Sequence, residues 1–394
     1  MRAGGIAYLS WKHLSYRPLR TLTLVAAIAL TIYLPLALYV FTSESTRILQ
    51  ERARSTPLLL GPKGSSLDLT LNALYFTSQE LPSLKHLAYT KLAKERFGTT
   101  IPIHARFHAK EAPIIGTSLA YFDARTLPVA EGRMITRLGD CVIGARLARR
   151  NDLHPGDRIT SSPENVFDLA GVYPLRMRIT GILAANHTPD DDAVFADLKT
   201  TWVIEGLAHG HQDLANPTAA DAVRKRKGNS IQANASVVEF NEVTENNIAS
   251  FHFHGDPEHY PLSSVILIPK DKKSRALALG AYQGPSSSGQ LVIPLDAVTQ
   301  LTETLFATSK MTFAAFLLLG LTAFALAALV FLLSFRLRER EMQTYAKIGA
   351  RTASLVMLKS TEVAIVLISG IVLALLSAAI TKSFSAGLLP QLLN

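Results

Sequence analysis

The stretch that decides the fold begins with an apolar segment, MTFAAFLLLGLTAFALAALVFLLSF (residues 311–335), and continues through the charged RLREREMQTYAKIGA (336–350). A second apolar segment, TEVAIVLISGIVLALLSAAI (361–380), follows it closely. At about 1.5 Å per residue, either apolar segment is long enough as a helix to cross a hydrocarbon core of about 30 Å. The sequence therefore predicts membrane spans at 311–335 and 361–381, joined by a charged loop at 336–360.

A third apolar block, at 21–42, predicts a further span near the N-terminus, with Pro35 as a kink. The basic stretch before it, 1–20, contains spaced apolar residues with Trp and Tyr, which predicts an amphipathic helix at the membrane interface. The apolar run exceeds the core of a usual signal peptide and no small-x-small cleavage site follows, so we interpret it as an uncleaved anchor. We expect the helix to continue to Arg54, supported by ion pairs among Glu44, Arg47, Glu51 and Arg52.

Charge sets the topology and argues against a nucleic-acid partner. The net charge of +9 in 394 residues comes with Lys and Arg that cluster beside the apolar blocks, not with an aromatic-interleaved basic patch. By the positive-inside rule, 1–20 and 336–360 are cytoplasmic, and the domain at 43–310 lies outside. A short tail, 382–394, follows the last span.

The outer domain has short predicted strands between Gly, Pro and Asp turns, interrupted by helices, which predicts a mixed α+β fold. We expect strands at 101–108, 114–118, 141–144, 158–161, 175–183, 193–197 and 265–269, and helices at 83–97, 145–151 and 295–310. The polar residues 216–245 are predicted to form a loop or an insertion. The expected fold class is thus an α-helical transmembrane protein with three spans and a large α+β extracytoplasmic domain between the first two.

Several polar residues of this domain have a structural interpretation. Cys141 is the one cysteine, so no intramolecular disulfide can form, and its apolar surroundings indicate a buried strand residue. Asp157, in a Pro-Gly-Asp turn, is expected to accept hydrogen bonds from backbone amides. The run Asp190 to Asp192 is expected to be solvated or to cap the backbone, with calcium binding as the alternative.

Histidines raise a metal hypothesis for the same domain. Alternation in residues 251–254 would put two imidazoles on one strand face, where they could chelate zinc; a polar strand or surface loop is the alternative. The candidate ligands are His209, His211, His252, His254 and His259. No other cofactor is expected on this chain, and no residue set predicts catalysis.

The opening RLRERE (336–341), the closing KIGAR (347–351) and the acidic Glu362 together resemble the permease subunit of MacB/FtsX-type ABC transporters. Gly132-Arg133, Val-Ile-Gly-x-x-x-Ala at 142–148 and Pro-Gly-Asp at 155–157 resemble elements of that family's outer domain. The resemblance implies a multi-pass protein of the bacterial inner membrane with its large domain in the periplasm. It also implies that ATP hydrolysis by a separate subunit moves the outer domain, so that a substrate is exported or extracted from the periplasmic side.

The loop is the expected site of coupling. A helix from 338 to 348 would place Met342, Tyr345 and Ile348 on one side, and Gly349 could end it. On spacing alone the apolar side could equally lie on lipid, whereas the resemblance implies docking to an ATPase. The implied coupling residues are Arg338, Glu339, Arg340, Glu341, Met342, Tyr345, Lys347, Ile348 and Gly349. Intramembrane Glu362 is expected to pair with a nearby Arg or Lys.

Partners follow from the resemblance and from the missing nucleotide motif. The chain has no Gly-x-x-x-x-Gly-Lys-Ser/Thr sequence, so it is not expected to be an enzyme, and ATPase activity is expected on a cytoplasmic ABC ATPase dimer. A second permease copy is expected, because small residues on the last two spans provide faces for close packing: Gly320, Ala323, Ala327, Gly370 and Ala374. Membrane lipids and a periplasmic adaptor or substrate-binding protein complete the expected partners.

Two alternatives stay open. The chain could be a membrane-anchored sensor or regulatory protein with an extracytoplasmic ligand- or metal-binding domain, although its cytoplasmic segments are too short for an output module. Permeases of the resembled family usually have a fourth span, whereas only residues 382–394 follow the third here. The sequence is expected to be either a three-span variant or a truncated chain.

Overall fold

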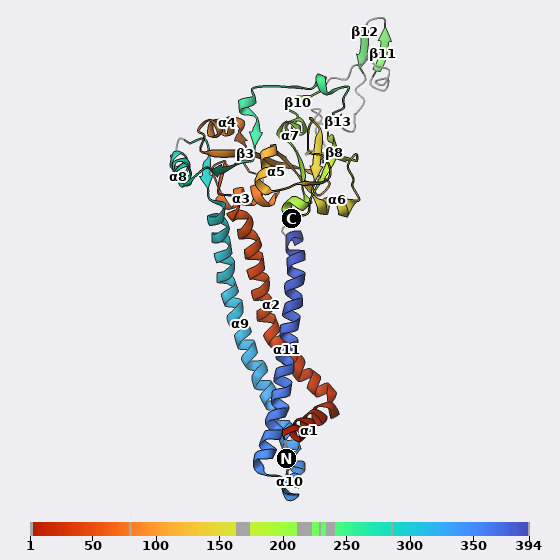
Figure 1. The fold of residues 1–394 in the computed structure, drawn as a ribbon, viewed down its shortest axis with the longest axis vertical. Helices are drawn as coiled ribbons and strands as arrows, with labels where there is room; N and C mark the ends of the chain where they lie inside the picture. Colours follow the sequence, from red (N-terminus) through yellow and green to blue (C-terminus); the bar gives the residue numbers. More distant parts are fainter. Residues whose placement is uncertain are drawn as a thin grey trace. The chain divides into compact units, whose positions relative to one another are not determined.

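A computed structural model describes residues 3–78, 81–162, 174–210, 223–227, 230–233, 241–284 and 287–392. The chain divides into two units (Figure 1). The helical unit contains residues 1–49 and 300–391, and the outer unit contains residues 50–299. Each is described by itself below.

The helical unit contains long helices that match the predicted spans. Its elements are α1 (Ala3–Tyr16), α2 (Pro18–Arg54), α9 (Pro294–Leu337), α10 (Glu339–Lys347) and α11 (Thr352–Leu392). Among the described residues, three segments are long and apolar enough to cross a membrane: Pro18–Arg54, Lys310–Leu337 and Thr352–Ser383. The three-span prediction is confirmed. Within the connection predicted at 336–360, α10 matches the helix expected from 338 to 348, whereas α11 begins earlier than expected, at Thr352.

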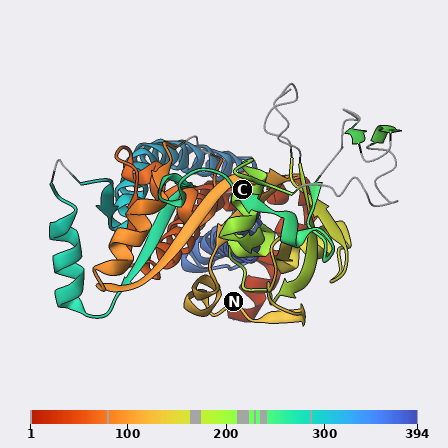
Figure 2. The ribbon, with the colours of Figure 1, turned by 90° about the horizontal axis from the view of Figure 1, so that it is seen from above.

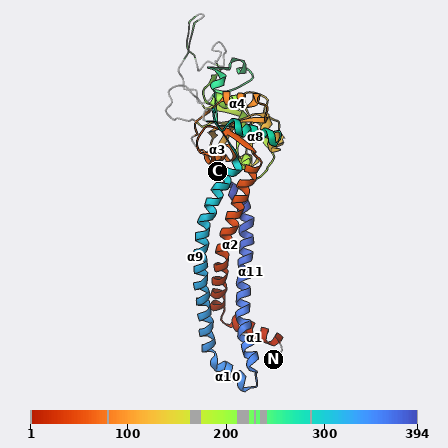
Figure 3. The ribbon, with the colours of Figure 1, turned by 90° about the vertical axis from the view of Figure 1, so that its left-hand side faces the viewer.

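Within this unit, α2, α9 and α11 run side by side (Figures 1 and 3). Leu24, Phe331 and Val366, one from each helix, pack into a common apolar cluster. A Cβ added at Gly370 would lie 2.7 Å from the Ile28 side chain, so the glycine permits the close approach of α11 to α2. Gly370 was one of the small residues predicted to form a dimer interface, and in the structure it packs against a helix of the same chain.

The outer unit is built on a mixed sheet of eleven described strands. Its path is β13-β8-β6-β9-β4-β3-β16-β1-β17, and β5 and β7 both pair with β8. Strand β3 and its antiparallel neighbour β16 are the orange and teal strands that cross Figure 2. The strands are β1 (Leu58–Gly61), β3 (Gly98–Ala109), β4 (Ala112–Thr117), β5 (Val129–Gly132), β6 (Asp140–Ile143), β7 (Arg158–Thr160), β8 (Leu175–Leu183), β9 (Val194–Asp197), β13 (Asn241–Glu242), β16 (Ser264–Pro269) and β17 (Gln290–Val292).

Helices and short strands surround this sheet. The helices are α3 (Ser66–Tyr75), α4 (His86–Lys94), α5 (Leu119–Arg125), α6 (Ala145–Asn151), α7 (Leu198–Ile204) and α8 (Lys272–Ala281), with the 3-10 turns η1 (Pro189–Asp192), η3 (Ile248–Ser250) and η4 (Pro257–His259). Three two-stranded ribbons pair β2 (Leu84–Lys85) with β15 (Pro261–Leu262), β10 (Ala208–His209) with β14 (His252–Phe253), and β11 (Val223–Lys227) with β12 (Ser230–Ala233). The prediction of a loop over 216–245 is wrong where β11 and β12 form a hairpin, because a strand without apolar alternation gives no sequence signal.

The sheet is buried on both faces. On β6, Cys141 and Ile143 belong to one apolar cluster, and Val142 between them belongs to another. This explains the near-continuous apolar run that the sequence shows there. Cys141 is fully buried, as predicted, and burial raises the pKa of its thiol well above the ordinary value, which makes it inert.

Gly144, at the end of β6, allows the backbone of η1 to lie against it. A Cβ at this position would be 2.2 Å from the carbonyl oxygen of Asp190 and 2.3 Å from the carbonyl carbon of Asp191. Neither atom can move without displacing the turn. The glycine of the Val-Ile-Gly motif is therefore required for packing.

We expect Gly144→Ala to lower the free energy of unfolding by about 1–3 kcal/mol, the usual cost of overpacking. Unfolding in urea would be followed by the fluorescence of the buried Trp202, with Trp11, the other tryptophan, replaced by phenylalanine. Gly280→Ala in α8 is the matched control, since a Cβ there meets no atom within 4 Å and alanine favours a helix. Equal unfolding midpoints for the two variants would contradict this account of Gly144.

Candidate functional site

The first candidate site is α10, the short helix that follows α9. Its residue Met342 is buried and packs against Ile6 of α1 and Leu358 of α11. Tyr345 lies partly buried at the edge of the same cluster. One side of α10 is thus fixed within the chain by apolar contacts.

An ion-pair network anchors the start of α10. The Arg338 guanidinium donates from Nη1 to both carboxylate oxygens of Glu362, at 2.9 and 3.1 Å, and its Nη2 lies 2.7 Å from Nδ1 of His13. His13 Nδ1 is also 3.2 Å from the Glu362 carboxylate. Both Arg338 and Glu362 are buried, so the expected pairing of Glu362 is present in the structure. The network ties α10 to α1 and α11.

The predicted coupling residues divide into a buried group and an exposed group, apart from Tyr345, which is partly buried. Arg338 and Met342 are buried inside the helical unit, where their contacts hold α10 in place. Ile348 is 76% exposed, and Gly349 follows it in the left-handed region, with φ +96°, where the helix ends. The exposed members are Glu339, Arg340, Glu341, Lys347, Ile348 and Gly349.

This arrangement provides an exposed surface on a fixed base. Charged side chains of both signs and one apolar side chain project from a helix whose opposite side is buried. Such a surface can dock on a protein partner by charge complementarity around an apolar contact. Sequence periodicity alone grouped Met342 with Ile348, and the structure separates them.

The second candidate site lies on the outer unit, where three of the five predicted histidines meet. Potential ligand atoms of His209, His252 and His254 lie within 4.8 Å of one another. His259 instead pairs with Asp256, with Nδ1 3.2 Å from the carboxylate. His211 lies outside the described residues.

The acidic run in η1 is buried, and the prediction that it is solvated is wrong. Asp190 is 1% exposed and accepts two hydrogen bonds from the Arg52 guanidinium, at 2.8 and 2.9 Å. Tyr121 donates a third, at 2.7 Å. Asp191 accepts hydrogen bonds from the backbone amides of residues 186 and 187, which agrees with the alternative prediction that the run caps the backbone. Asp192 accepts a hydrogen bond from Arg146 at 2.7 Å.

These contacts explain the electrostatics of Asp190. Burial alone would raise its pKa, but the positive charge and hydrogen bonds of Arg52, with the Tyr121 hydroxyl, hold the pKa of the carboxyl well below its ordinary value. Asp190 is therefore a structural anion. Asp157 likewise has a structural role, since its carboxylate accepts from the backbone amide of His154 at 2.8 Å, as predicted.

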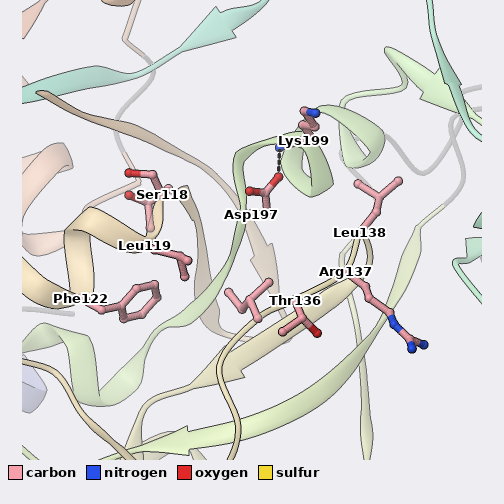
Figure 4. A pocket seen from close by; sticks show the side chains of 10 residues that line it. Ser118, Leu119, Phe122, Thr136, Arg137, Leu138, Asp197 and Lys199 are labelled. Atoms are coloured by element: carbon pink, nitrogen blue, oxygen red, sulfur yellow. Dashed lines mark hydrogen bonds between the residues drawn. The ribbon is translucent and has the colours of Figure 1, made fainter. Parts of the chain in front are cut away.

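A mixed polar and apolar pocket of about 380 Å³ lies between α5, α7 and the segment before β6 (Figure 4). Asp197 caps α7 there by accepting from the amide of Lys199 at 2.9 Å. Phe122 and Leu119 line the opposite wall. Asp197 is the one carboxylate among the described lining residues, and its hydrogen bond to the helix start gives it a structural role.

Sequence reasoning missed the roles of His13, Arg52 and Arg146. Arg52 was expected to form ion pairs along its own helix, as Arg47 does with Glu44 at 3.1 Å, but it is buried against Asp190. The partners of these residues lie far away in the sequence, and no local pattern signals them. A buried charged side chain needs a partner, because burying an isolated charge costs much free energy, but this rule does not say which residue the partner is.

The fold and the sites define a membrane protein with one large extracytoplasmic α+β domain inserted between its first two spans. The sequence profile of the MacB-like periplasmic core domain matches residues 23–234, more than half of the chain. The chain therefore belongs to the MacB-like periplasmic core domain family, and the resemblance to permease subunits of MacB/FtsX-type ABC transporters is confirmed.

Two solved structures are similar over the larger part of this chain. The periplasmic region of MacB from Actinobacillus actinomycetemcomitans has 14% identity and a TM-score of 0.34, covering 65% of this chain and 98% of that one. The extracellular domain of the noncanonic ABC-type transporter YknZ from Gram-positive bacteria has 11% identity and a TM-score of 0.31, covering 60% of this chain and 99% of that one. None of the curated proteins matches this sequence.

Proposed function

We propose that this transporter component is a permease subunit that transmits ATP hydrolysis by a separate cytoplasmic ABC ATPase to movement of its extracytoplasmic domain. The chain supplies no nucleotide-binding loop of the Walker type, so ATP chemistry belongs to the partner. In this proposal the protein lies in a bacterial inner membrane, works with a second permease copy, and exports or extracts a substrate from the periplasmic side.

The observation that carries the proposal is the construction of α10. Its buried side, centred on Met342, packs on α1 and α11, and the Arg338–Glu362 pair fixes its first turn. Its exposed side presents Arg340, Lys347 and Ile348. A partner that pushes on this exposed side would move α1 and α11 with it, because the buried contacts hold the three helices together.

The proposal predicts that Arg340→Glu combined with Ile348→Asp weakens binding to the ATPase and lowers ATP hydrolysis of the complex by about tenfold or more. Loss of an apolar anchor and reversal of a neighbouring charge remove the two features on which such interfaces depend. The full chain would be co-purified with its ABC ATPase subunit, and ATP hydrolysis would be measured in lipid nanodiscs.

Lys94→Glu on α4 is the matched control, because it reverses one exposed charge on a helix of the outer unit that takes no part in the proposed docking surface. It should leave both co-purification and hydrolysis unchanged. The proposal fails if the double variant retains the ATPase at the level of the unmodified protein and hydrolyses ATP at the same rate.

A further inference from the structure

We propose that His209, His252 and His254 form a binding site for a late first-row transition-metal ion, with Zn²⁺ as the expected physiological choice. The site lies on the extracytoplasmic domain. The proposal is independent of the coupling function, because it involves no residue of α10 or its supporting network.

Strand pairing brings the three histidines together. In the ribbon formed by β10 and β14, His209 lies directly opposite His252. His254 lies two residues beyond His252, so the strand alternation directs both imidazoles to one side. Phe251 and Phe253 pack against the domain core on the other side. The core therefore determines which way the imidazoles face.

The backbone around the cluster is held by hydrogen bonds. The amide of His254 donates to the carbonyl of Leu207 at 2.9 Å, and its own carbonyl accepts from the Tyr260 hydroxyl at 2.9 Å. On the other strand, a Cβ at Gly210 would lie 2.5 Å from the Phe251 ring, so that ring rests on the backbone beside His209. Both strands are anchored before any metal arrives, which lowers the entropy cost of binding.

The distances suit a metal after small side-chain rotations. The imidazole of His254 stacks on that of His209 with centroids 4.6 Å apart, and it meets that of His252 at 4.5 Å. Zn–N bonds of about 2.0–2.1 Å in a tetrahedron require ligand nitrogens about 3.4 Å apart. Because the present separations are within 4.8 Å and all three side chains are exposed, rotation about their side-chain bonds can close the difference.

A hydrogen bond prepares His252 as a ligand. Its Nδ1 lies 3.1 Å from the carbonyl oxygen of Ser250. A carbonyl can only accept, so Nδ1 carries the proton in this contact, and the lone pair of the neutral ring is on Nε2. A backbone carbonyl bound to the far nitrogen is the usual outer-shell partner of a metal-binding histidine.

The donor set selects the class of metal. Imidazole nitrogens suit zinc, copper, nickel and iron, whereas calcium and magnesium require oxygen ligands. Three protein ligands leave the fourth tetrahedral position of a zinc ion open for water or for an atom of another molecule. Among the residues that the structure describes, the cluster consists of imidazoles alone, a donor set that suits this class of metal and not calcium.

Isothermal titration of ZnCl₂ into the full chain, purified in detergent through a tag without histidine, tests the proposal. We expect one Zn²⁺ per chain, and a loss of affinity of more than about tenfold in each of His209→Ala, His252→Ala and His254→Ala. His259→Ala is the matched control, since His259 is an exposed neighbour paired with Asp256, and it should bind as the unmodified chain does.

Two further measurements separate loss of ligands from loss of fold. Without metal, the three variants should melt at the temperature of the unmodified chain, because their side chains are exposed. Co²⁺ should give the intense visible absorption of a tetrahedral site in the unmodified chain and in His259→Ala but in none of the three variants, and excess Ca²⁺ should not displace it. Unchanged Zn²⁺ affinity in all three variants, or an equal loss in His259→Ala, would overturn the assignment.

Discussion

Replacing Arg52 by alanine should lower the free energy of unfolding of the outer unit by about 3–5 kcal/mol, because the substitution leaves the Asp190 carboxylate buried without its cation. Both oxygens of Asp190 accept from the guanidinium, and the pair is almost fully enclosed. Arg52 also donates from Nε to the carbonyl of Leu74, so the end of α3 loses a hydrogen bond as well.

The measurement is urea unfolding of the full chain in detergent. Trp202 reports on the outer unit once Trp11, the other tryptophan, is replaced by phenylalanine. Arg137→Ala is the matched control, because its pair with Glu245 is exposed on both sides and exposed pairs contribute little. If the unfolding midpoints of the two variants agree, the buried pair does not stabilise this domain as argued.

The same pair predicts how stability depends on pH. The folded pKa of Asp190 lies below the unfolded value of about 3.9, so its stabilising effect is complete above that value and is lost as the pH falls. Unfolding midpoints of the unmodified chain should therefore decrease below about pH 4. Asp190→Asn, already less stable at neutral pH, should show a smaller decrease over the same range.

Replacing Arg338 by alanine should have the second large effect, with loss of most ATP hydrolysis coupled to the partner and a stability cost of about 3–5 kcal/mol in the helical unit. Glu362 would remain buried beside His13 without its guanidinium partner, and α10 would lose the contact that fixes its first turn. Coupled hydrolysis in nanodiscs and the melting temperature of the full chain in detergent would both be measured.

Two variants distinguish the effect of an unpaired buried charge from the effect of the Arg338–Glu362 pair on the position of α10. Arg338→Met combined with Glu362→Met removes both charges, so it should recover the melting temperature while coupling stays low, because an apolar pair cannot orient α10 in the same way. Arg336→Ala removes an exposed arginine from the preceding turn and should change neither quantity. Full coupled hydrolysis in Arg338→Ala would show that the network does not position α10.

The long apolar runs and the strands with clear turn signals could be predicted from the sequence. The helices that contain the spans could be predicted from continuous apolar length. Strands such as β8 (Leu175–Leu183) could be predicted from apolar residues that alternate with polar ones, here over 175–180. The β11–β12 hairpin lacks such a pattern, and its basic residues indicated a loop. A strand can be predicted from sequence only where burial of one face makes apolar and polar residues alternate.

The candidate sites show the same limit. The sequence predicted that Glu362 pairs with a cation near the membrane. It could not identify that cation as Arg338, with His13 beside it, because this pairing depends on how three helices pack. Asp190 and Arg52 are 138 positions apart in the sequence, and single-sequence reasoning has no means to pair them. The histidine cluster was partly visible, because alternation relates His252 to His254, whereas the participation of His209 depends on the register of β10 with β14.

The burial of Cys141 has a practical consequence for studying movement in this protein. Since it is the one cysteine and its thiol is enclosed by the sheet, a thiol reagent applied to the folded chain should find no native target. A cysteine introduced at an exposed position such as Lys94 or Arg340 would then be the single reactive group. Spectroscopic probes can therefore be attached at chosen positions without first removing the native residue, and distance changes during ATP turnover can be followed in the otherwise unmodified protein.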